Sequence, residues 1–234
     1  MRPTLVLFDI DGTLLDAAGA GRRGLEASFR LVFGIEDIEA PASRVRFGGQ
    51  SDPTIIAAIA REAGLPGDVV EARYVELQSA YLGALRKELS TPDPRRRVMP
   101  GVPALLEALA VRPDVVLGLV TGNVEAGARV KLEAFGLNRY FADGGFSSDH
   151  PERPEIARIA HERMSRRAGF RFPSDRVMVV GDTELDIACA RANGFCAIAV
   201  ESGWVPREHL EAAEPDALFA DLTDAPAVMA AMGL

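Results

Sequence analysis

The chain has 234 residues, of which 48% are hydrophobic and 26% are charged, and its formal net charge at pH 7 is -8. This length can form one sizeable globular domain, or a domain with a smaller insertion. The negative charge argues against a protein that binds nucleic acid or anionic membranes. The first apolar run is interrupted by Asp9, too early for a signal peptide, and no charge-free apolar stretch approaches the about 18 residues of a membrane span. Two cysteines do not make a disulfide framework, so we expect a cytoplasmic protein.

The first ninety residues are predicted to be one strand followed by helices. The apolar run at 5–8 predicts a buried strand, and apolar residues at helical spacing predict helices ending at Gly34, over 54–60 and from Val70 to Leu89. Residues 90–97 form a charged, proline-rich hinge, whose three arginines could bind an anion or form a solvated linker. Residues 17–97 are therefore predicted to be a helical unit that could act as a lid.

From Gly101 onward, helices and strands are predicted to alternate. The predicted elements are helices over 102–109, before Gly136, over 154–167, before Gly194 and over 225–232, with strands over 115–120, within 141–146, and over 177–180, 196–200 and 217–220. Such alternation predicts an α/β fold, in which a Rossmann-like parallel sheet is covered by helices on both faces. We expect residues 1–16 and 98–234 to form this core, with residues 17–97 inserted as a second, helical domain.

Polar side chains follow three of the predicted strands, and parallel strands place their carboxyl ends on one edge of the sheet. These residues are Asp9, Asp11, Thr121, Asp182 and Asp186. Acids at such an edge suggest a hard cation, an anionic substrate, or both. Taken singly, each has a simpler interpretation: an acidic turn, a helix N-cap at Thr121, or a first-turn acid at Asp186.

Three motifs in this order resemble those of the haloacid dehalogenase superfamily. Residues 9–14 (Asp-Ile-Asp-Gly-Thr-Leu) resemble its first motif, residues 121–123 (Thr-Gly-Asn) its second, and residues 181–186 (Gly-Asp-Thr-Glu-Leu-Asp) its fourth. The helical insertion is similar to the family's C1-type cap domain, and the second motif is similar to that of phosphoglycolate-phosphatase-like members. The resemblance implies a Mg²⁺-dependent phosphatase acting on a small phosphorylated metabolite.

The resemblance also implies roles for the residues of the first two motifs. Asp9 would attack phosphorus and form an aspartyl-phosphate. Asp11 would protonate the leaving alcohol and then activate water, and this second acid favours phosphate chemistry over dehalogenation. Thr121, with the main-chain amides of Gly122 and Asn123, would bind the transferring phosphoryl group.

The metal ligands implied by the resemblance come from the first and fourth motifs. They are the Asp9 carboxylate, the Asp11 main-chain carbonyl and Asp182, with Asp186 as a further ligand or an anchor. Mg²⁺ prefers such a set of a few carboxylates completed by water and phosphate oxygens.

The sequence departs from the family at the third motif, which normally supplies a lysine before the helix that leads into the fourth. The only lysines are Lys87 and Lys131. Arg153 is the best substitute by position, because its guanidinium can neutralise the same charge. Lys131 is the rival, but a helix starting near Val124 would carry it about 10 Å away from the sheet edge.

The substrate is less well defined by the sequence. The polar turn 48–52 and the pair Arg22-Arg23 could face a substrate, although the two arginines could equally be solvated. Alternative functions are a phosphoryl-transfer mutase, a pyrophosphatase, or a non-catalytic protein that binds a phosphometabolite. The expected partner is a small phosphorylated metabolite, with no nucleic acid and no membrane, and the protein is expected to be a monomer or homodimer.

Overall fold

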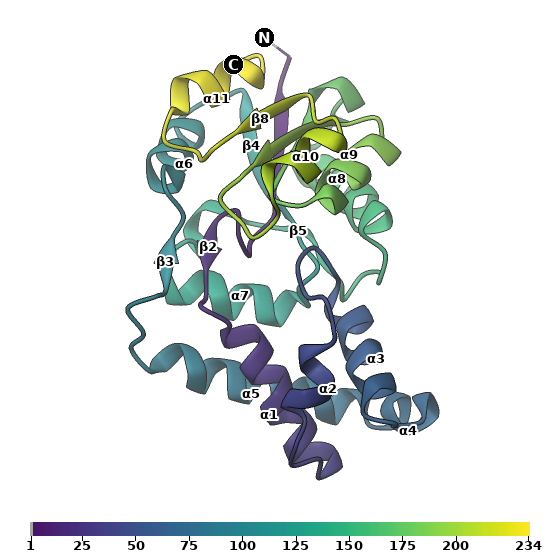
Figure 1. The fold of residues 1–234 in the computed structure, drawn as a ribbon. Coiled ribbons are helices and arrows are strands. Elements are labelled where there is room, and N and C mark those ends of the chain that lie inside the picture. The colour runs from purple at the N-terminus through teal and green to yellow at the C-terminus, as the bar shows by residue number, and fades with distance from the viewer. Residues whose placement is uncertain (1) are drawn as a thin grey trace.

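The computed structural model describes residues 2–234 and contains a six-stranded parallel sheet flanked by helices (Figure 1). The strand order is β5 (Gly144–Gly145), β4 (Val115–Val120), β1 (Thr4–Phe8), β6 (Val177–Gly181), β7 (Cys196–Val200) and β8 (Ala217–Phe219), and all neighbours pair in parallel. The α/β prediction is confirmed. Because β1 lies between β4 and β6, the residues that follow these three strands meet at one edge.

Alternate residues of the central strand pack into two separate apolar layers. Leu5 and Leu7 lie against α8 (Arg153–Ala168) and α9 (Glu184–Ala192), in a layer that α10 (Arg207–Ala212) also joins. Val6 and Phe8 point the other way, toward α6 (Val102–Ala110), α7 (Glu125–Ala134) and α11 (Ala225–Ala231). A strand buried on both faces needs a continuous apolar run, which explains the apolar sequence of β1.

A helical cap is inserted after the first strand. The chain leaves through β2 (Leu15–Asp16) and returns through β3 (Arg97–Val98), and these two short strands pair antiparallel. Between them lie α1 (Ala20–Phe33), α2 (Glu39–Ser43), α3 (Asp52–Glu62), α4 (Gly67–Ala72) and α5 (Tyr74–Ser90). Helices α1 and α5 pack side by side, and the group lies beyond the carboxyl edge of the sheet (Figure 1). The predicted inserted cap is confirmed, whereas the limits of the two domains stay a prediction.

One predicted helix is wrong in length. The stretch from Val70 to Leu89 forms two helices that meet at Arg73, which leaves the helical conformation with φ -113° and ψ 16°. The Arg73 side chain donates to the main-chain oxygen of Val32 at the end of α1, so the break lies at a contact between helices. Helices α2 and α10 and the β2–β3 pair were not predicted, because each is too short to show a periodic pattern. Within residues 2–234, no helix has both the length and the apolar character needed to cross a membrane.

Candidate active site

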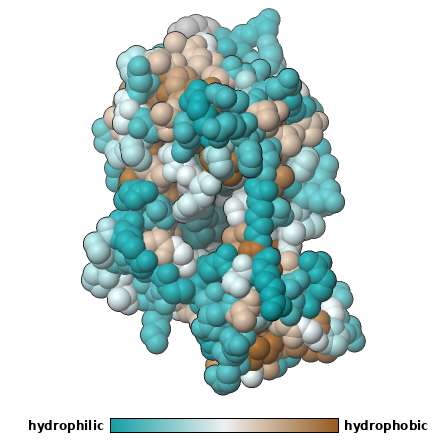
Figure 2. Space-filling view, viewed as in Figure 1, coloured by the Kyte–Doolittle hydropathy of each residue, from teal (hydrophilic) through white to brown (hydrophobic). Residues whose placement is uncertain are grey.

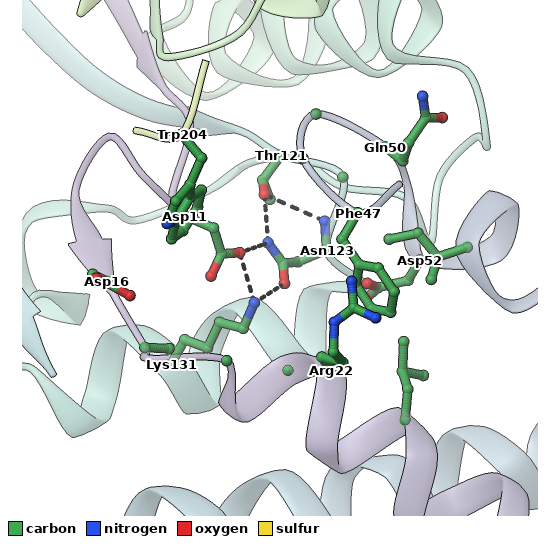
Figure 3. Close-up of a pocket in the computed structure, with 18 of the residues that line it drawn as sticks. Asp11, Asp16, Arg22, Phe47, Gln50, Asp52, Thr121, Asn123, Lys131 and Trp204 are labelled. Carbon is green, nitrogen blue, oxygen red and sulfur yellow. Dashed lines mark hydrogen bonds and ion pairs between the residues drawn. The ribbon is translucent and has the colours of Figure 1, made fainter. Parts of the chain in front are cut away.

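A cavity of about 710 Å³ lies between the carboxyl edge of the sheet and the cap. Its core side is lined by residues that follow β1 and β4, including Asp9, Asp11, Thr121 and Asn123, and its other side by residues of the cap. The surface is hollowed between these two parts of the molecule (Figure 2), and Figure 3 shows the side chains inside. The predicted polar edge thus lines a cavity beneath the cap.

Three buried carboxylates meet at the carboxyl edge of the sheet, where one of them, Asp9, reaches the cavity. Asp9, Asp182 and Asp186 each offer an oxygen within 4.8 Å of the others, and they are 4%, 1% and 2% exposed. Asp182 also accepts a hydrogen bond from the Thr13 hydroxyl at 3.0 Å. The chain packs tightly around it, since a Cβ at Gly12 (φ +87°) would lie 2.3 Å from an Asp182 carboxylate oxygen. Glycine after Asp11 is therefore required both by the conformation and by this approach.

The cluster holds more negative charge than its surroundings can stabilise. Burial raises the pKa of Asp9 to about 7, with further increases from the charges of Asp186 and Asp11, while Arg153 opposes the change. Burial, together with the charges of Asp9 and Asp186, also raises the pKa of Asp182 well above its usual value. Adjacent buried carboxylates ionise together only when a cation is close. A divalent cation fits this set of oxygen donors.

Arg153, at the start of α8, supplies a positive charge beside the cluster. Its guanidinium donates to Asp186, lies 3.4 Å from an Asp9 oxygen and donates to the main-chain oxygen of Gly49 at 3.2 Å. The other Asp186 oxygen accepts from the main-chain N–H and the hydroxyl of Thr183, at 3.1 and 2.7 Å, and caps α9. The residue favoured by sequence position therefore contacts the proposed nucleophile, and these contacts favour an anchoring role for Asp186.

Lys131 also lies in the site, and the expectation that its helix carries it away from the sheet edge is wrong. Its ammonium is 2.6 Å from Asp11 Oδ2 and 2.7 Å from Asn123 Oδ1, and the residue is only 5% exposed. Helix α7 runs across the space between the sheet and the cap helices (Figure 1), so its residues stay near the edge. Both cations considered for the third motif are present, each next to a different catalytic candidate.

Asn123 joins the ends of β1 and β4 through its side chain. Its amide nitrogen donates to Asp11 Oδ2 at 2.9 Å and to the Thr121 hydroxyl at 2.8 Å (Figure 3). Its amide oxygen accepts from Lys131. The resemblance implied a role only for the main-chain amide of Asn123, and nothing in the sequence pattern indicated this side-chain connection. The result is a fixed orientation for the Asp11 carboxylate.

The cap contacts the Thr121–Asn123 loop directly through Asp52, a residue that the sequence analysis assigned no role of its own. The Asp52 main-chain N–H donates to Gly122 O at 2.7 Å, and its carboxylate accepts the Val124 N–H at 2.8 Å. A Cβ at Gly122 would lie only 2.2 Å from the main-chain oxygen of Gln50. In the sequence, Asp52 was one member of the polar turn 48–52, and no pattern distinguished it from its neighbours.

The two adjacent arginines of α1 have different environments. Arg22 lines the cavity, whereas Arg23 pairs with Glu88 at 2.7 Å. The turn 48–52 reaches the cavity through Gly48, Gly49, Gln50 and Asp52. The possibility that this turn and one arginine of the pair face the site therefore agrees with the geometry.

The fold and the site together define an α/β protein with an acid-rich pocket under a helical cap. The family model described as haloacid dehalogenase-like hydrolase matches residues 3–194, which is more than half of the chain. The chain therefore belongs to the haloacid dehalogenase-like hydrolase family.

Individual relatives agree with this family. The chain is 31% identical to "Probable phosphatase IndB" of Dickeya dadantii, over 93% of this chain and 89% of that protein. It is 28% identical to "Phosphoglycolate phosphatase" of Mesorhizobium japonicum, over 94% of this chain and 91% of that protein. Among solved structures, CbbY from Rhodobacter sphaeroides in complex with phosphate has the same fold, with a TM-score of 0.74, 20% identity and full coverage of both chains.

Proposed function

We propose that this hydrolase is a Mg²⁺-dependent phosphatase that cleaves a small phosphorylated metabolite through an aspartyl-phosphate. The observation that carries the proposal is the arrangement of Asp9 and Asp11, each beside a cation, in the lining of one cavity. Relatives named as phosphatases over nearly the full chain support the same reaction. Phosphoglycolate and similar monoesters are the substrates that the second of these relatives suggests.

In the first step, an Asp9 oxygen attacks phosphorus and the bond to the leaving alcohol breaks. Asp11 gives its proton to the alcohol oxygen as that bond breaks. In the second step, water attacks the phosphorus of the aspartyl-phosphate, Asp11 takes the proton from the water, and inorganic phosphate leaves with Asp9 restored. Lys131 and Asn123 both donate to Asp11 Oδ2, so we assign proton transfer to Oδ1.

The remaining residues neutralise charge and position the phosphoryl group. Thr121 and the main-chain amides of Gly122 and Asn123 hydrogen-bond its oxygens, and Arg153 lowers the cost of bringing two anions together. Asp9, Asp182 and the Asp11 main-chain carbonyl would hold Mg²⁺, with Asp186 as an anchor. The bound ion would supply positive charge to the phosphoryl oxygens.

The test is hydrolysis of p-nitrophenyl phosphate and of a panel of phosphometabolites, with and without Mg²⁺. Asp9→Asn should reduce turnover by at least about 1,000-fold, because it removes the nucleophile. Asp68→Asn is the matched control, since Asp68 is an exposed acid of the cap. The proposal fails if the native protein shows no metal-dependent turnover on any compound, or if Asp9→Asn retains it with an unchanged circular dichroism spectrum.

A further inference from the structure

The cations that line the cavity differ in how they are paired. Their ion pairs are Arg46 with Glu184, Arg95 with Asp93, Arg97 with Asp16, Lys131 with Asp11 and Arg153 with Asp186. Arg22 is the remaining basic residue of the lining, and among residues 2–234 no carboxylate forms an ion pair with it. Among the described residues that line the cavity, it is therefore the basic side chain without an ion pair to a carboxylate of the chain.

Two contacts hold the Arg22 guanidinium in place without neutralising it. One terminal nitrogen donates to the main-chain oxygen of Ala42 at 2.7 Å, and the group lies 3.9 Å from the centre of the Phe47 ring. A guanidinium has five N–H donors in a fixed plane, so most of them remain for another partner. Glu26, one turn further along α1, is close enough for Arg22 to lower its pKa, although burial raises that pKa overall. Arg22 is thus oriented in advance.

The position of Arg22 is opposite the proposed chemistry. In Figure 3, Arg22 and Phe47 reach into the cavity from the cap, while Asp11, Asn123 and Lys131 face it from the other side. The substrate's phosphoryl group would lie on the core side, so the non-reacting end of the molecule would extend toward α1. A fixed guanidinium fork there matches a carboxylate or a second phosphate.

We propose that Arg22 is a specificity-determining residue that binds an anionic group at the non-reacting end of the substrate. The substrate class is then a phosphomonoester that also carries a carboxylate or a second phosphate. This inference rests on the proposed function, because it concerns the substrate of the same site. It adds a requirement that the phosphatase reaction itself does not impose.

A purely structural role for Arg22 would give a different pattern of effects. If Arg22 only ties α1 to the segment that contains Ala42 and Phe47, its loss would impair every substrate alike. If it binds an anion, its loss would selectively raise the KM for substrates with a second anionic group. The comparison of two matched substrates therefore separates the two roles.

The first experiment measures kcat and KM for three series of monoesters of increasing chain length. One series ends in a carboxylate, beginning with phosphoglycolate; one ends in a second phosphate; and the third ends in a neutral hydroxyl, beginning with 2-hydroxyethyl phosphate. The native enzyme should prefer at least one anionic series to the neutral series. Arg22→Gln should lower kcat/KM on the preferred series by about 10- to 100-fold, as expected for the loss of hydrogen bonds to a charged group, and should leave the neutral series nearly unchanged.

Arg23→Gln is the matched control, because Arg23 is the adjacent arginine on α1 but pairs with Glu88. It should keep the native preference. Arg22→Lys should restore part of the preference, since it keeps the charge and loses the planar fork. The series that Arg22→Gln affects identifies the carboxylate or the phosphate as the group recognised.

Binding without turnover keeps the inference separate from the proposed function. Isothermal titration calorimetry would compare 3-phosphonopropionate, which cannot be hydrolysed, with 3-hydroxypropylphosphonate, and would include a bisphosphonate. If no monoester is hydrolysed, the proposed function fails, but tighter binding of an anionic-ended ligand that Arg22→Gln removes still supports the inference. Equal affinity for all ligands, or an equal loss on all of them in Arg22→Gln, overturns it.

Discussion

Asp52→Asn should stabilise the protein at neutral pH and leave its stability nearly unchanged in acid. Asp52 is 7% exposed, and burial raises its pKa from 3.8 to about 6, although Lys131 and the Val124 N–H oppose the change. The folded state therefore holds a proton between these two pH values that the unfolded state has lost. Stability falls as pH rises through this window, because the folded state binds more protons than the unfolded state.

The size of the effect follows from the difference between the two pKa values. A difference of about two units corresponds to about 3 kcal/mol, which is the cost of the ionised carboxylate above pH 6 or so. Asparagine removes the charge, and its amide oxygen can still accept the Val124 N–H that Asp52 now accepts at 2.8 Å. The free energy of unfolding should thus rise by up to about 3 kcal/mol at pH 8.

The assay is urea unfolding of the native protein and of Asp52→Asn across pH 4 to 8. The difference between them should grow as pH rises from about 4 to about 6 and then stay constant. Asp68→Asn is the control substitution, because Asp68 is an exposed acid of the cap. A destabilised Asp52→Asn at pH 8, or a difference independent of pH, would refute the reasoning.

Three further results are expected. Lys131→Met should lower kcat by about 10- to 1,000-fold with little effect on KM, because Asp11 loses its cation; unchanged steady-state kinetics would contradict this role. Gly122→Ala should lower the free energy of unfolding by about 1–3 kcal/mol in thermal denaturation, since its methyl would overlap Gln50 O, and an unchanged Tm would argue against the cap contact. Trp204, the only tryptophan, lines the cavity, so titration with inorganic phosphate should alter its fluorescence. If calorimetry shows that phosphate has saturated the protein and the fluorescence spectrum is unchanged, the predicted binding of phosphate in this cavity is contradicted.

The main features of the fold follow from local patterns in the sequence. A strand buried on both faces must be continuously apolar, so the runs at 5–8, 115–120, 177–180 and 196–200 were recognisable. Right-handed crossovers between parallel strands then leave little freedom in where the strands end. For this reason Asp9, Asp11, Thr121, Asp182 and Asp186 were expected together at one edge, and the structure places them there.

The partners of these acids depended on tertiary structure. Lys131 reaches Asp11 across 120 residues because α7 lies along the sheet edge, and a helical pattern in the sequence gives no direction for the helix axis. Asp52 reaches Val124 across 72 residues only because the cap lies against the Thr121–Asn123 loop. Arg22 and Arg23 are indistinguishable by pattern, and only packing against Phe47 and Glu88 separates them. The sequence by itself thus determined that the acids of the candidate site gather at one edge, since right-handed crossovers place the strand ends there, and it also pointed to Arg153. The position of Lys131 was decided by the direction of α7, and those of Asp52 and Arg22 by how the cap packs on the core.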